Sequence, residues 1–180
     1  MKRLAVLLFE LTVLRRGPQD MPTGLAFQKS VLLAYVLVNL VLLQMSSAWS
    51  TAVLQLVLDC LLMVSFTWPL LYVSGYRARF SQTLTALLGA DAVINFFALP
   101  ALASLNQAPS ELGILVMLLL MLWHWLVIGH IYRHALERPL LFTLILAFLY
   151  LMLSSQIMEA VFPPVTMTPE IVEQASDITT

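Results

Sequence analysis

Long apolar runs alternate with short polar segments along the whole chain. Continuous runs such as ILVMLLLMLWHWLVIG lack the every-second-residue polarity of strands in a membrane barrel. A helix needs about 20 apolar residues to cross a bilayer, and the chain reaches about that length in five segments: 28–46, 51–74, 82–105, 111–132 and 139–162. A backbone in lipid must satisfy its own hydrogen bonds. The pattern therefore predicts an all-α, polytopic membrane bundle of five transmembrane helices.

Composition supports the same fold class. The chain is 61% hydrophobic and 11% charged, whereas soluble proteins are about 45 to 50% apolar and about 25% charged. We expect a single membrane domain, 1–162, followed by a flexible acidic tail, 163–180. The expected partners are the lipid bilayer and other membrane proteins or a second copy of the chain, with no nucleic acid.

The basic residues predict the orientation of the bundle. All nine Lys and Arg lie before or at the start of the first span, after the second or after the fourth: Lys2, Arg3, Arg15, Arg16, Lys29, Arg77, Arg79, Arg133 and Arg138. These places share one side of a five-span topology, and the loops on the other side have no basic residue. Because cytoplasmic loops are enriched in Lys and Arg, we expect a cytoplasmic amino terminus and a periplasmic or extracellular carboxyl terminus.

Residues 1–16 form an amphipathic segment that is too short to span. The run from Leu4 to Leu14 would measure roughly 16 Å as a helix, and Glu10 interrupts it. We expect a short interfacial helix that presents leucines to the membrane, and not a cleaved signal peptide. Packing of this helix against the spans is an equally open alternative.

A polar motif separates this helix from the first span. The connecting motif comprises Arg15, Arg16, Gly17, Pro18, Gln19, Asp20 and Pro22. We expect the glycine and prolines to end the helix and redirect the chain, while the arginines hold it on the cytoplasmic side. Asp20 has two possible roles, as a cap of the following turn or as a partner of a nearby arginine. We predict that any cytoplasmic recognition surface lies here.

The stretch RRGPQDMP resembles a pattern, RxGPQDLP, of small bacterial inner-membrane proteins, with Met21 in place of the leucine. An amphipathic helix followed by five spans is also similar to the plan of the YIP-type membrane proteins. The resemblance implies a multi-pass protein of the bacterial inner membrane. It supplies no catalytic residue.

Polar side chains at similar depth form the main candidate site. Four spans each carry one near the middle, and helical spacing adds two more, giving Asn39, Gln55, Asp59, Asp91, Asn95 and His124. A carboxylate at that depth costs about 2.5 to 3.5 kcal/mol on insertion scales, so these groups are expected to face the bundle. They could share protons or bind a cation, or they could form a hydrogen-bond cluster that fixes helix packing.

Other chemistry is weakly indicated. His130, His134 and Glu137 share a helical face, but Arg133 lies among them and no HExxH pattern occurs, so we expect no metal and no cofactor. No GxSxG, Walker or CxxC pattern is present either. The sequence therefore predicts a non-enzymatic accessory, scaffold or assembly factor that binds partners in the membrane. The alternative is a small proton- or cation-coupled transporter using Asp59, Asp91 and His124, and a weaker one is an enzyme acting on lipid.

Overall fold

The computed structural model describes residues 2–107 and 111–163, and this part of the chain is helical with no strand. Its elements are α1 (Lys2–Thr12), η1 (Pro18–Asp20), α2 (Leu25–Gln44), α3 (Trp49–Val73), η2 (Arg77–Arg79), α4 (Phe80–Gln107), α5 (Glu111–Leu136) and α6 (Leu140–Val161). The all-α prediction is confirmed. The predicted tail falls almost entirely outside the described residues.

Helices α2 to α6 are each long and apolar enough to cross a membrane. Their number and order are those predicted from the apolar runs. Helix α2 begins at Leu25, earlier than the predicted 28, because the backbone of Gly24 is extended and its carbonyl accepts the N–H groups of Phe27 and Gln28. These five helices fit an integral membrane protein.

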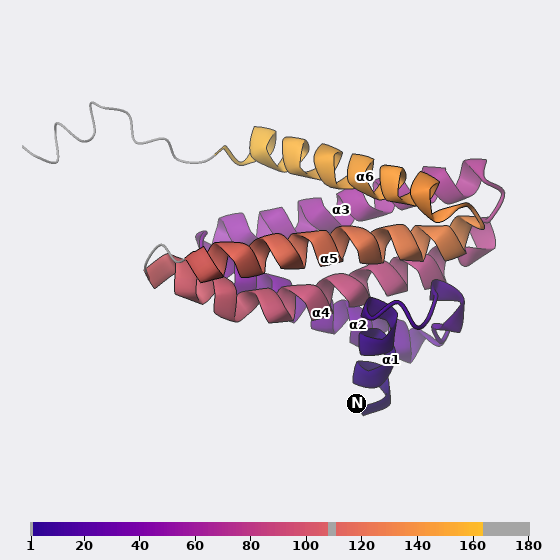
Figure 1. The fold of residues 1–180 in the computed structure, drawn as a ribbon, viewed down its shortest axis with the longest axis horizontal. Helices are drawn as coiled ribbons and strands as arrows, with labels where there is room; N and C mark the ends of the chain where they lie inside the picture. Colours follow the sequence, from indigo (N-terminus) through magenta and orange to yellow (C-terminus); the bar gives the residue numbers. More distant parts are fainter. Residues whose placement is uncertain (1, 108–110, 164–180) are drawn as a thin grey trace, which may run out of the picture.

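Helix α4 is the centre of the bundle. Half of its most apolar window is buried, against 17% to 22% in the other four spans. Its buried face carries the small residues Ala86, Gly89 and Ala90, and small side chains allow helices to approach closely. Figure 1 shows α3 and α6 on one side of the bundle, with α4, α2 and α1 toward the other.

Helix α1 lies across the other helices and not along them (Figure 1). Leu8 and Leu11 are buried against the bundle, with Leu8 next to Gly89 of α4. The indole nitrogen of Trp123 donates to the carbonyl oxygen of Thr12 at 2.8 Å. The last turns of α1 therefore pack against α4 and α5, as one of the two alternatives anticipated. Its position at a membrane surface stays a prediction.

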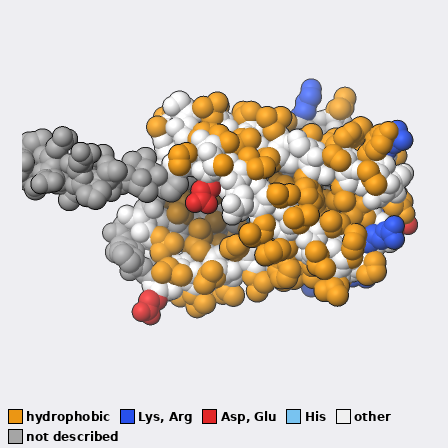
Figure 2. Space-filling model, turned by 90° about the horizontal axis from the view of Figure 1, so that it is seen from above, with side chains coloured by type: hydrophobic (Ala, Val, Ile, Leu, Met, Phe, Trp, Pro, Cys, Tyr) orange, Lys and Arg blue, Asp and Glu red, His pale blue; other side chains and the backbone are white. Residues whose placement is uncertain are grey.

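Apolar side chains cover the outside of the bundle. Figure 2 shows hydrophobic groups along the whole length of one face, while the visible Lys and Arg lie in the right-hand half of the view. Leu118, Met121, Ile145 and Phe148 of α5 and α6 are all exposed. An apolar surface of this extent is typical of contact with lipid or with other membrane proteins.

Candidate functional site

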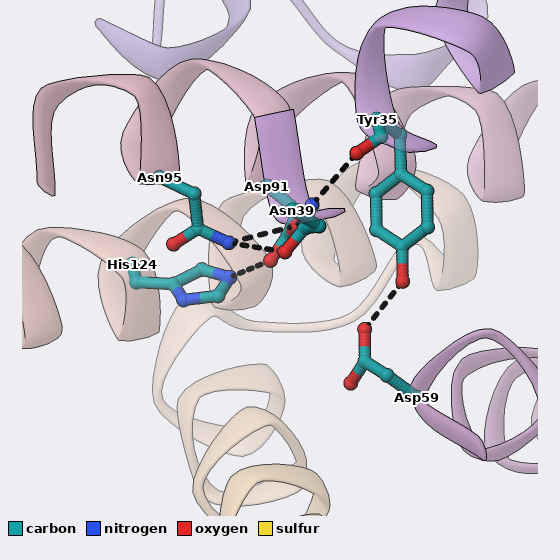
Figure 3. A network of polar contacts seen from close by, with 6 residues as sticks. All are labelled: Tyr35, Asn39, Asp59, Asp91, Asn95 and His124. Carbon is teal, nitrogen blue, oxygen red and sulfur yellow. Dashed lines mark hydrogen bonds and ion pairs between the residues drawn. The ribbon is translucent and has the colours of Figure 1, made fainter. Parts of the chain in front are cut away.

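The polar residues of the spans meet around Asp91, which is buried on α4. Its Oδ2 accepts hydrogen bonds from Nδ2 of Asn39 at 2.7 Å and from Nδ2 of Asn95 at 3.0 Å. The Asn95 amide also donates to Oδ1 of Asn39 at 2.9 Å. The three side chains form a closed triangle between α2 and α4 (Figure 3).

His124 approaches the same carboxylate from α5. Its Nε2 lies 3.6 Å from Oδ1 of Asp91, which is beyond hydrogen-bond distance but within reach of an ion pair if the imidazole is protonated. Three helices thus contribute to one buried polar centre. The sequence placed Asn39, Asp91 and His124 at similar depth and added Asn95 by helical spacing, and the structure brings these groups together.

Asp59 of α3 reaches the cluster through a residue that the sequence analysis missed. Its Oδ2 accepts a hydrogen bond from the hydroxyl of Tyr35 at 2.5 Å, and Tyr35 is almost completely buried. The carbonyl oxygen of Tyr35 accepts a second bond from Nδ2 of Asn39 at 3.1 Å. The available signal was the spacing of Tyr35 four residues before Asn39, on the same face of α2.

A cavity of about 190 Å³ connects the two carboxylates. Asn39, Gln55, Asp59, Asp91 and Asn95 supply its polar lining, and apolar side chains of α2, α3 and α6 complete it. The space is far larger than the roughly 10 to 15 Å³ that one water needs, and its lining offers several polar partners. The carboxylates therefore border a space that water or a small ion can occupy.

Gln55, which was predicted to share a helix face with Asp59, bonds to a residue outside the polar cluster. Its Oε1 accepts a hydrogen bond from the Ser47 hydroxyl at 3.2 Å, so the side chain is tied to the loop after α2. It lines the cavity but does not bond to the carboxylate. The amide nitrogen of Gln44, nearby in sequence, is buried without a hydrogen-bond partner in the described structure.

The described residues contain no group of three His, Cys, Asp or Glu side chains able to hold a metal ion. The rings of His130 and His134 are in contact, with centroids 4.5 Å apart. Glu137 accepts hydrogen bonds from Arg79 at 2.5 Å and from the Tyr76 hydroxyl at 3.1 Å. These bonds lower the pKa of Glu137.

The connecting motif is docked onto the bundle. The Gly17 N–H donates to Oδ2 of Asp20 at 2.9 Å, and the Asp20 N–H donates to the Gly17 carbonyl at 3.1 Å. Asp20 therefore caps η1, and it forms no ion pair with an arginine among the side chains that the structure describes. Arg16 pairs with Glu10 at 2.5 Å, and its carbonyl lies 3.0 Å from Nε2 of His130 on α5.

The remaining motif residues divide between surface and core. Pro18 is buried, whereas Arg15, Gln19 and Pro22 are exposed. Met21, which follows Asp20 in the chain, is also buried, and its carbonyl oxygen accepts a hydrogen bond from the side-chain amide of Gln82 of α4 at 3.1 Å. The motif thus joins α1 to the bundle through backbone contacts and leaves Gln19 at the surface.

No protein-family model, no curated protein and no solved structure matches this chain. The similarity of RRGPQDMP to a bacterial inner-membrane motif, and of the plan to YIP-type proteins, therefore stays a prediction. Function has to be argued from the geometry.

Proposed function

We propose that this protein is a small, non-enzymatic membrane transporter in which Asp59 binds and releases a proton beside Asp91. The observation that most supports this proposal is that two carboxylates from different helices line one cavity of about 190 Å³. A cluster that served only to fix helix packing would be expected to close around its polar groups, because close packing is the rule in protein interiors. The open space beside the carboxylates therefore supports the exchange of a proton at Asp59.

The two carboxylates have unequal surroundings, which suggests different roles. Asp91 has two amide donors on one oxygen and His124 beside the other. Hydrogen bonds to an ionised carboxylate are stronger than neutral ones, so this group is equipped to stay charged. Among the described residues, Asp59 has a single side-chain donor, Tyr35. We therefore assign proton exchange to Asp59.

A proton suits this site better than a metal ion. Binding a hard cation requires several free oxygen ligands at short distance. Here the Oδ1 of Asn39 and the Oδ2 of Asp91 already accept amide hydrogens. A proton needs only one free oxygen, and the cavity gives it a path to Asp59.

Infrared difference spectroscopy of the protein in nanodiscs tests this proposal without knowledge of the substrate. All carboxyl groups of the chain contribute to the band that appears on acidification, and Asp59 should contribute one component of it in wild type. Asp59→Asn should remove that component, since the amide cannot take up the proton. Glu159→Gln is the matched control, because Glu159 is an exposed carboxylate that does not line the cavity, and it should keep the Asp59 component.

Two results would contradict the proposal. The first is a carboxyl band in Asp59→Asn that matches the wild-type band in intensity and pH midpoint, and the second is a loss in Glu159→Gln that equals the loss in Asp59→Asn at the same pH midpoint. Tyr35→Phe serves as a second variant if Asp59→Asn does not fold. It removes the one side-chain donor to Asp59 among the described residues, which should displace the pH midpoint of the Asp59 component. An unchanged midpoint would count against exchange at Asp59.

A role as an accessory or scaffold protein is the second candidate. It is favoured by an apolar groove of about 450 Å³ on the outside of α5 and α6, which exposes Met121, Leu122 and Phe148 beside Trp125. A membrane helix of another protein, or of a second copy, would fit such a surface. Replacing Leu122 by Trp should then abolish co-purification of that partner while leaving the carboxyl titration intact.

A further inference from the structure

A second cavity, of about 390 Å³, lies at the end of the bundle where the basic residues gather. Its lining comes from η1, from η2 and from the end of α5 and the residues after it: Gln19, Arg79, Arg133, His134, Glu137 and Arg138. This is the end that the charge pattern predicts to be cytoplasmic. It is separate from the carboxylate cavity, with which it shares no residue.

Arg79 forms the fixed wall of this cavity. Its Nη1 donates to the carbonyl oxygens of His134 and Ala135, each at 3.3 Å, and its Nη2 pairs with Glu137. The guanidinium also stacks over the Tyr76 ring at 4.6 Å. These contacts close the last turn of α5 and neutralise Glu137.

Arg133 and Arg138 supply positive charge that nothing in the described ranges 2–107 and 111–163 neutralises. Neither forms an ion pair there. With Arg79 balanced by Glu137, the lining carries a net formal charge of +2, from three arginines and one glutamate with His134 counted as neutral. Two guanidinium groups therefore face one cavity without an anionic partner.

Gln19 extends the cavity on the side of the connecting motif. Its amide folds back over the Gly17 backbone, so a Cβ atom at position 17 would lie only 2.5 Å from Nε2 of Gln19. A side chain at position 17 would therefore displace the flexible Gln19 amide from this position. Gln19 thus adds a neutral hydrogen-bonding group to the lining of the cavity.

We propose that this cavity binds a phosphate-bearing anion. The guanidinium group of arginine is positively charged and planar, and its N–H groups can donate two parallel hydrogen bonds to the oxygens of a phosphate. Basic pockets at the cytoplasmic ends of membrane helices are suited to lipid headgroups, and a free phosphate compound would present the same chemistry. The site lies at helix ends, where a headgroup of the adjoining leaflet can reach it.

Lipid retention measured by native mass spectrometry tests the proposal. The full chain is purified from nanodiscs that contain equal amounts of phosphatidylglycerol and phosphatidylcholine. Wild type should retain phosphatidylglycerol in preference, and Arg133→Gln with Arg138→Gln should lose that preference. At about 1 kcal/mol for each basic residue near the surface, the double variant should bind roughly 30-fold more weakly.

Arg77→Gln is the matched control. Arg77 lies at the same end, stacks over the Tyr72 ring at 4.0 Å and does not line the cavity. It should retain phosphatidylglycerol as wild type does. Added inorganic phosphate separates the two sources of the ligand: displacement of the lipid indicates a free phosphate compound, and no displacement indicates a lipid headgroup.

Two outcomes would overturn the site. One is equal retention of the two lipids by wild type without binding of inorganic phosphate. The other is an equal loss in Arg77→Gln and in the double variant, which would indicate general attraction to a basic surface. A thermal unfolding curve for each variant verifies that the arginine substitutions leave the fold intact.

Discussion

The hydrogen bond from Tyr35 to Asp59 connects α2 to α3, and its strength reports the charge on Asp59. Tyr35→Phe removes one buried hydroxyl and leaves the ring in place, so packing changes little. A hydrogen bond to a charged group contributes about 1.5 to 3 kcal/mol, and one to a neutral group about 0.5 to 1.5 kcal/mol. The bond of 2.5 Å is at the short end for a hydroxyl donor, as charge-assisted bonds are. We expect a loss near 2 kcal/mol if Asp59 is ionised.

A double-mutant cycle isolates this contact from the other consequences of each change. Unfolding free energies are measured for wild type, Tyr35→Phe, Asp59→Leu and the double variant in detergent micelles. The coupling energy should reach about 1 kcal/mol or more. Tyr132→Phe is the matched control, because Tyr132 is equally buried but bonds to Thr67 on α3 at 3.1 Å. It should show no coupling to Asp59→Leu, and a Tyr35 coupling as small as that of the control would refute the reasoning.

Three further predictions concern other parts of the chain. Gly129→Leu should separate α5 from α6 and lower the melting temperature measured by circular dichroism, because a Cβ atom at position 129 would lie 3.3 Å from the Cα of Leu144. Asp20→Ala should lower the free energy of unfolding measured with denaturant by about 1 kcal/mol, because the cap of η1 is lost. An unchanged denaturation midpoint would argue against this capping role. The lowered pKa of Glu137 means that its pairing with Arg79 stabilises the fold above the ordinary glutamate pKa of about 4.3 and that this is lost as the pH falls through the folded-state value. Glu137→Gln should therefore reduce the acid sensitivity of the melting temperature.

Residue types and their depth were enough to anticipate part of the candidate site. Asn39, Asp91 and His124 stand near the middle of apolar runs, and burying a polar group without a partner is costly, so their convergence was expected. The role of Tyr35 was not anticipated, because a tyrosine in an apolar run is compatible with core packing and only its direction reveals the bond to Asp59. The bond between Gln55 and Ser47 similarly depends on a rotamer that no spacing rule predicts.

The sequence by itself determined the helices. Length, apolar content and the positions of proline and glycine act within each segment, so five spans could be delimited before their arrangement was known. The tertiary structure decided how those helices meet: that α1 packs against α4, that Asp59 and Asp91 border one cavity, and that Arg133 and Arg138 face a second. These features depend on crossing angles and rotamers set by packing between segments distant in the chain, and such contacts leave no periodic mark in the sequence.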